Sequence, residues 1–343
     1  MFNYILRRLL TLPVVILGVT LLIFLMMQLL SPYQLLASYI RSPEELKNKD
    51  PDTLIKIYGL DRPAGERYIK WLKNIVKGDL GWSNSANMSV VDAIKARFPA
   101  TLELALYAVI PVVFGGILLG SFAAMHHNQI GDHITRIFSI IGWSLPSFVG
   151  GLFILMVFYG VLGWFPPGRL STWAYQIVYS DQFTSYTGMY TIDALLNGNL
   201  KVFWDAIRHL IGPVLTLSYL WWAFIMRITR SSMLDILNKD YVRTGRSKGL
   251  PESVVIKKYI RKNALIPVIT VGGLMILGLL GGVVIVETVF DFKGIGLLTA
   301  TAAQQLDYAA VLGTTMFYCF LLVIVNLVVD ILYAVIDPRV RLE

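Results

Sequence analysis

Six apolar stretches, each long enough to cross a lipid bilayer as a helix, constrain this chain more than any other feature. The hydrocarbon core of a bilayer is about 30 Å thick and takes roughly 20 apolar residues of helix. The predicted spans are residues 9–30, 104–125, 137–162, 210–228, 264–286 and 309–336. The expected fold class is therefore an all-α integral membrane protein with six transmembrane helices.

The overall composition agrees with this interpretation. Charged residues make up 15% of the 343 residues, against about 25% in an average soluble domain, and 56% are hydrophobic. These values exclude a disordered chain, a coiled coil and an ordinary cytosolic enzyme. The single cysteine, Cys319, excludes an internal disulfide and a multi-cysteine metal site. No small-x-small site follows residues 9–30, so this stretch predicts a span and not a cleaved signal peptide.

Basic residues predict the orientation of the spans. Ten of them lie in residues 227–262, from the end of the fourth span to the start of the fifth: Arg227, Arg230, Lys239, Arg243, Arg246, Lys248, Lys257, Lys258, Arg261 and Lys262. The connection after the fifth span contains one basic residue, Lys293. Because short cytoplasmic loops carry an excess of Lys and Arg, we expect residues 227–262, the turn 126–136 and both termini in the cytoplasm. Topology thus explains the net charge of +8, and no nucleic-acid partner is expected.

The chain is expected to have three parts. Residues 1–30 form the N-terminal segment and the first span, and residues 31–100 an extracytoplasmic segment. Residues 101–343 form a core with the other five spans, an outer loop at 163–209 and a basic cytoplasmic loop at 231–263. Apolar residues at helical spacing predict an amphipathic helix over residues 68–77, ended by a turn at 78–82. This helix either lies on the membrane surface or packs against neighbouring spans.

The outer loop is rich in aromatic residues: Trp164, Trp173, Tyr175, Tyr179, Phe183, Tyr186, Tyr190, Phe203 and Trp204. Such side chains stack on sugar rings or bind a partner protein. They also form interfacial belts and small packed caps. Both interpretations remain open at this point.

Common catalytic signatures are absent from the sequence. It contains no Walker A loop, no HExxH pair and no GxSxG elbow. Three histidines, His126, His127 and His133, lie near one cytoplasmic turn. Without cysteines or paired carboxylates nearby, they are expected to be solvated loop residues and not metal ligands.

Few ionisable residues fall in or near the predicted spans. Glu103 and Glu287 lie near span ends, where capping or snorkelling explains them. Asp330, one turn after Asn326, is expected to form an interhelical hydrogen bond. An ion-coupled carrier is expected to have more carboxylates at mid-depth. The count therefore argues against a secondary transporter.

Two pairs of glycines are spaced four residues apart within spans. Gly116 with Gly120 and Gly278 with Gly282 place small residues one helical turn apart, and Gly272-Gly273 adds to the second pair. This spacing allows two helix backbones to approach closely. The partner helix belongs either to a second membrane subunit or to this chain.

The most specific segment lies in the basic cytoplasmic loop. Residues 240–251 read DYVRTGRSKGLP and residues 261–267 read RKNALIP. This segment resembles the EAA-type loop of ABC importer permeases, in the version of the dipeptide/oligopeptide permease family. Gly249 stands at the motif glycine, and Arg243, Thr244 and Gly245 occupy the EAA positions. Residues 4–9, 58–63, 78–81, 98–104, 187–190 and 287–296 extend the resemblance over nearly the whole chain.

The sequence departs from the family pattern in two places. Ser31-Pro32-Tyr33-Gln34 replaces a Pro-Gly-Asp-Pro run, and the outer loop is longer and more aromatic. Both departures lie on the outer side, which receives the substrate.

The resemblance implies a first (B-type) permease subunit with the type I ABC importer fold, in the inner or plasma membrane of a prokaryotic cell. Its partners would be a homologous second permease, two ABC ATPases, an extracytoplasmic substrate-binding protein and membrane lipid. ATP and Mg would bind to the ATPases, so this chain is expected to have no cofactor, no metal and no catalytic residue. Peptides are the leading substrate class, with oligosaccharides second and nickel chelates or glutathione third. Alternatives from other classes are a secondary transporter and a scaffold subunit of a membrane complex.

The resemblance also implies which residues couple the spans to the ATPases. They are Asp240, Tyr241, Arg243, Thr244, Gly245, Arg246, Lys248, Gly249, Leu250 and Pro251. A short helix over 241–248, ended by Gly249 and restarted near Pro251, would project from the membrane. An ATPase would hold it in a cleft, and its movement would switch the spans between inward- and outward-facing states. In the alternative interpretation the basic residues only anchor topology or bind anionic lipid.

Overall fold

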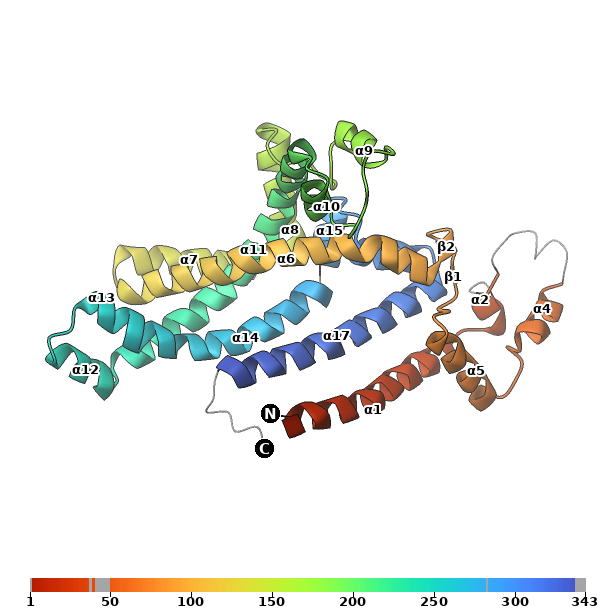
Figure 1. Cartoon of the computed structure of the whole chain (residues 1–343), viewed down its shortest axis with the longest axis horizontal. Coiled ribbons are helices and arrows are strands. Elements are labelled where there is room, and N and C mark those ends of the chain that lie inside the picture. The colour runs from red at the N-terminus through yellow and green to blue at the C-terminus, as the bar shows by residue number, and fades with distance from the viewer. Residues whose placement is uncertain (1, 37–38, 41–49, 282, 337–343) are drawn as a thin grey trace. The chain divides into compact units, whose positions relative to one another are not determined.

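The computed structural model describes residues 2–36, 39–40, 50–281 and 283–336, almost entirely as helices (Figure 1). The elements before the outer loop are α1 (Phe2–Met27), α2 (Pro32–Leu36), α4 (Pro51–Tyr58), α5 (Ala64–Val76), β1 (Trp82–Ser83), β2 (Met88–Ser89), α6 (Val90–Met125), α7 (Ile130–Ser144), α8 (Ser147–Ile154) and the π-helix η1 (Leu155–Val161). The later elements are α9 (Thr172–Val178), α10 (Tyr190–Leu196), α11 (Leu200–Leu237), α12 (Asp240–Ser247), α13 (Glu252–Val254), the π-helix η2 (Val255–Arg261), α14 (Lys262–Gly281), α15 (Val284–Val289), α16 (Ile295–Gln304) and α17 (Tyr308–Ile336). The chain forms two compact units, one made of Met1–Thr101 and Lys293–Ile331, the other of Leu102–Phe292 and the end of α17.

The first unit contains the predicted amphipathic helix as α5, which begins four residues earlier than expected. Its Tyr68 and Trp71 rings lie 5.2 and 5.9 Å from the ring of Phe24 in α1. The helix therefore packs against α1 through one aromatic face. Gly78 and Gly81 follow with positive φ angles of 80° and 96°, which form the predicted turn.

A buried carboxylate fixes the β-ribbon of the first unit. The antiparallel pair β1–β2 leads into α6, and Asp307 lies just before α17. One carboxylate oxygen of Asp307 accepts hydrogen bonds from the hydroxyl of Ser83 at 2.7 Å and the backbone N–H of Ser85 at 2.9 Å. Its other oxygen accepts the backbone N–H of Ala310. Asp307 is thus satisfied by three partners although it is buried.

In the second unit, α6 and α11 approach closely through the predicted glycine pair. A Cβ atom added at Gly116 would lie 2.7 Å from the side chain of Ile225. One added at Gly120 would lie 2.6 Å from the Cβ of Thr229 and 2.7 Å from the carbonyl oxygen of Met226. These glycines therefore pack against a helix of the same chain, which answers the question left open for this pair. Gly278 of α14 likewise lies under the ring of Trp221, whereas Gly282 lies outside the described residues.

The third predicted span, 137–162, is wrong as one continuous helix. Helix α7 ends at Ser144, and α8 with η1 continues from Ser147 at an angle of 109°. Leu145 has an extended backbone with φ −84° and ψ 126°, because Pro146 disfavours the helical region at the residue before it. Pro146 also lacks an N–H to donate to the helix. The apolar run masked this break in the sequence.

The fifth predicted span, 264–286, is also divided. Helix α14 ends at Gly281, and α15 begins at Val284. Val283 forms a turn before α15, so the described residues do not continue as one helix. Glu287 in α15 is buried, so the expected snorkelling does not describe it. The side chain of Asp330, for which an interhelical hydrogen bond was expected, lies outside the described part of the structure.

Three described helices are long and apolar enough to cross a membrane: α6, α11 and residues 308–329 of α17. The bent pair of α7 with α8–η1 makes a fourth if it forms one span. In α1 the described side chains begin at Pro13, and in α14 they are described only in part. The finding supports a helical membrane protein with three to four candidate spans.

The outer loop folds into a small cap around a buried ion pair. Glu103 of α6 and Arg169 are 2% and 7% exposed, and their nearest nitrogen and oxygen atoms are 2.7 Å apart. The second oxygen of Glu103 accepts hydrogen bonds from the backbone N–H and the hydroxyl of Thr191. The Arg169 guanidinium also donates to the Gly188 carbonyl and lies 3.9 Å from the ring centre of Tyr190. Glu103 is therefore a buried structural partner of the loop and not a snorkelling residue.

The outer aromatic residues divide into two groups. Tyr175, Phe183, Tyr190 and Phe203 pack in the core of the cap with α9 and α10. Trp164, Trp173, Tyr179, Tyr186 and Trp204 are exposed. The packing interpretation therefore holds for the first group, and the exposed group remains available for a ligand or a partner.

The close approach of α6 and α11 predicts opposite effects for two glycine substitutions. We expect Gly120→Ala to lower the free energy of unfolding by about 1–3 kcal/mol, because the new methyl group meets backbone atoms of α11. Gly18→Ala in α1 is the matched control, because a Cβ there meets nothing within 4 Å. Its higher helix propensity should stabilise the chain by up to about 1 kcal/mol. Thermal unfolding of the purified protein in detergent measures both, and equal effects would contradict the packing described.

Candidate functional site

The basic loop between α11 and α14 forms a short helix followed by a sharp turn. Two residues separate the end of α11 from α12, which begins at Asp240 and stops at Ser247. Gly249 then adopts a φ of +71°, a conformation that glycine takes without strain. Pro251 precedes α13, which starts at Glu252. The helix thus begins and ends one residue earlier than the predicted 241–248, and the glycine turn and the restart lie where the sequence predicts them.

One face of α12 is buried against the helix that follows it. Val242 is fully buried in a core with Val255 and Ile260 of η2 and with Met233 of α11. Gly245 is buried as well, and a Cβ at this position would lie 3.8 Å from the ring of Tyr259. These apolar contacts attach α12 to the ends of α11 and η2. The sequence did not identify Val255, Ile260 or Tyr259 as part of this site, although their apolar character was the available signal.

The opposite face of α12 is polar and exposed. Asp240, Tyr241, Arg243 and Lys248 are all exposed. Arg243 approaches Asp240 only to 3.8 Å, with side chains that are 71% and 98% exposed. A surface pair of this kind contributes little to stability, so the guanidinium of Arg243 is available to a partner. The face therefore presents charge and one aromatic ring to whatever lies beyond it.

A second ion pair closes the glycine turn. The guanidinium of Arg246 donates two hydrogen bonds to the carboxylate of Glu252, at 2.6 and 3.1 Å. These bonds hold the pKa of Glu252 below its usual value. The pair joins the end of α12 to the start of α13 across the turn at Gly249. Glu252 was missed in the sequence because it follows the motif and only the fold places it opposite Arg246.

The turn between α6 and α7 shares the same core. Ala124 and Met125, the last residues of α6, pack with Met233 and Val242. In Figure 1 this turn lies at the same end of the second unit as α12 and α13. Helix α12 therefore shares one packed core both with α11 and with the connection between α6 and α7.

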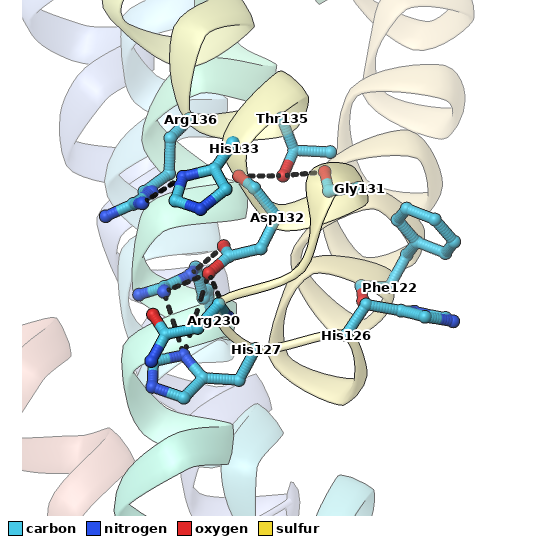
Figure 2. Close-up of polar contacts among 10 residues, drawn as sticks. Phe122, His126, His127, Gly131, Asp132, His133, Thr135, Arg136 and Arg230 are labelled. Carbon is cyan, nitrogen blue, oxygen red and sulfur yellow. Dashed lines mark hydrogen bonds and ion pairs between the residues drawn. The ribbon is translucent and has the colours of Figure 1, made fainter.

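Arg230 of α11 holds this turn through an ion pair with Asp132 (Figure 2). The guanidinium of Arg230 donates to both carboxylate oxygens of the buried Asp132, at 2.6 and 2.7 Å. Asp132 also accepts the backbone N–H of Asn128, which has a φ of +61°. A bidentate arginine–carboxylate pair is geometrically specific, so it fixes the position of the turn on α11.

The three histidines near this turn contact arginine side chains or the backbone. A ring nitrogen of His127 lies 3.1 Å from Arg230, and one of His133 lies 2.6 Å from Arg136. His126 bonds the carbonyl of Phe122 and points away from Arg230 (Figure 2). Among the described residues, no group of three or more His, Cys, Asp or Glu side chains is placed to hold a metal ion. Packing and ion pairs therefore join the helices at this end of the unit.

Comparison with known proteins places these features in a family. Residues 116–342 match the family described as the inner membrane component of binding-protein-dependent transport systems. The chain is 40% identical to the probable D,D-dipeptide transport system permease protein of Escherichia coli, over 96% of this chain and 94% of that protein. It is 38% identical to the di/tripeptide transport system permease protein of Pseudomonas aeruginosa, over 99% of both chains. It is 37% identical to the oligopeptide transport system permease protein of Bacillus subtilis, over 99% and 100%.

The family match includes α7, α11 and the α12–α13 loop, and the relatives extend it over the full length of the chain. The chain is therefore an inner membrane permease component of the binding-protein-dependent transport family.

Proposed function

We propose that this chain is one of two permease subunits of an ABC importer for dipeptides and oligopeptides. The observation that carries the proposal is that the similar permeases over nearly the full chain are named for dipeptides, di/tripeptides and oligopeptides. In this proposal an extracytoplasmic binding protein delivers the peptide to the outer side. The exposed aromatic residues of the cap, such as Trp173 and Trp204, are available to contact either of them.

We further propose the type I permease fold with six spans and cytoplasmic termini. The spans would be α1, α6, the bent α7–α8–η1 segment, α11, α14 and α17. Support comes from the basic residues of 227–262, which lie at the end of α11 that carries α12. A helix of 38 residues is about 57 Å long, so α11 exceeds the roughly 30 Å of the hydrocarbon core. Its two ends would then lie on opposite sides of the membrane.

The partners in this proposal are a homologous permease and two ATPases. ATP and Mg²⁺ would bind to the ATPases, and this chain would have no cofactor and no catalytic residue. The exposed face of α12 would sit in a cleft of one ATPase, with Arg243 and Lys248 opposite acidic groups. When the ATPases close around ATP, α12 would move as a rigid piece, because Val242 and Gly245 are packed against η2. The core shared with α11 and the α6–α7 turn would pass that movement to the spans.

Charge reversal on the exposed face of α12 tests this coupling. We expect Arg243→Glu to lower ATP-driven peptide uptake at least about tenfold, because repulsion by the proposed acidic groups of the ATPase would replace attraction at a desolvated interface. The amount of chain in the membrane should stay normal, since the Arg243 side chain is 71% exposed and its ion pair with Asp240, at 3.8 Å, is a weak surface contact. Lys77→Glu, at an exposed residue just after α5, is the control. Normal uptake by Arg243→Glu in an assembled complex would remove α12 from the coupling path.

Cysteine labelling tests the orientation. In a chain whose single cysteine is removed by Cys319→Ser, Ser247→Cys places a thiol at the end of α12 and Ser180→Cys places one after α9. Both serines are exposed, so each thiol should react when reagent reaches its side of the membrane. We expect an impermeant maleimide to label Ser180→Cys in intact cells, and Ser247→Cys only after the membrane is opened. The reverse pattern would invert the topology.

Calorimetry with the cognate binding protein tests the substrate class. The protein would be titrated with short peptides and with oligosaccharides of matched size. We expect only the peptides to bind, with Kd values that are micromolar or lower. Binding of sugars alone would contradict the peptide proposal and would assign the exposed aromatic residues of the cap to sugar stacking.

A further inference from the structure

A basic pocket lies between α7 and α11 in the second unit, and no residue of α12 is among the described residues that line it. Its volume is about 420 Å³, and its lining includes Arg136 and Trp143 of α7 with Arg227, Arg230 and Ser231 of α11. On α7 the lining residues follow at three- and four-residue intervals, which places them on one helix face. No carboxylate is among the described residues that line this pocket.

Two of the three guanidinium groups are not neutralised. Arg230 is bound by Asp132 through two hydrogen bonds. In the part of the chain that the structure describes, neither Arg136 nor Arg227 forms an ion pair with a carboxylate. Arg136 contacts a ring nitrogen of His133, and Arg227 lies 5.0 Å from the ring centre of Trp143. The groups facing the pocket therefore leave about two unpaired positive charges beside an aromatic ring.

The mouth of this pocket is apolar. Ile140 and Trp143 are each 64% exposed, and Ile137 and Ile141 on the adjacent face of α7 are exposed as well. Exposed isoleucines on a helix of a membrane protein suit hydrocarbon chains, whereas a tryptophan beside arginines is typical of the level of the lipid headgroups. The arginine side chains and the apolar surface beside them together match a molecule with an anionic head and an apolar tail.

We propose that this pocket binds an anionic phospholipid. Arg136 and Arg227 contact its phosphate, the hydroxyl of Ser231 donates to it, and the acyl chains lie along Ile137, Ile140 and Ile141. Charge complementarity favours an anionic over a zwitterionic lipid. This proposal rests on the proposed orientation only for the leaflet that supplies the lipid. The reason is that α7 and α11 meet at the end of the unit near α12. A bound lipid would join α7 to α11 beside the Arg230–Asp132 pair and stabilise the α6–α7 turn.

The test is native mass spectrometry of the full chain, alone and in the assembled transporter, titrated with phosphatidylglycerol or phosphatidylcholine. We expect preferential binding of phosphatidylglycerol. The double variant Arg136→Gln/Arg227→Gln should weaken it about 25-fold, at roughly fivefold for each arginine. Lys257→Gln/Lys258→Gln removes the same charge from exposed residues of η2 and should leave it unchanged. Thermal unfolding of each variant verifies that it is folded.

Four outcomes would overturn the proposal. Equal weakening in both double variants would mean a general attraction to basic surface, and unchanged binding in the pocket variant would place the lipid elsewhere. Displacement of the lipid by millimolar inorganic phosphate would assign the pocket to free anions. Binding by the isolated chain but not by the assembled transporter would assign this face to the second permease. Each measurement reads lipid binding alone, so failure here leaves the proposed transport function standing, and failure of peptide uptake leaves the pocket standing.

Discussion

The close packing of α6 against α11 is the constraint on which the second unit depends. Gly116 and Gly120 bring the two helix axes so near that a single methyl group at position 120 meets the Thr229 side chain and the backbone of α11. Apolar burial drives little association between helices in lipid, so van der Waals contact at short distance must hold them together. The same helix α11 receives the outer cap at its start and continues into α12 at its end. One packed helix pair therefore positions both ends of the unit.

Polar contacts link the start of α11 to the cap, and their burial strengthens them. Asp205 accepts the backbone N–H and the hydroxyl of Ser171 at 2.7 Å, and Arg208 donates to the carbonyl of Trp164. The Glu103–Arg169 pair adds a link from α6 to the same cap. Removing either partner would leave an uncompensated buried charge, which costs about 3–5 kcal/mol. These contacts attach the cap to both α6 and α11, so a binding protein that docks on the cap, as proposed, would act on these helices directly.

The sequence predicted what depends on local pattern and missed what depends on tertiary placement. Apolar runs located the helices, and the Gly249–Pro251 signature located the end of α12, because glycine and proline act on the backbone where they stand. By the same logic Pro146 signalled the break after Ser144, but the uninterrupted apolar run outweighed it. Glu252 opposite Arg246, and Glu103 opposite Arg169, have no local signature, since 66 residues separate the second pair. Only the fold shows that these charges are buried or paired.

The two ion pairs near α12 differ in burial and therefore in their contribution to stability. The Arg246–Glu252 pair is about half exposed, so solvent screens it and its contribution to stability is small. The Arg230–Asp132 pair has a fully buried carboxylate, and breaking it would strand that charge. The Arg230–Asp132 pair would therefore keep the α6–α7 turn on α11 when α12 is displaced. In the proposed coupling, α12 would move together with η2, on which Val242 and Gly245 pack, and the α6–α7–α11 corner would follow as a rigid body.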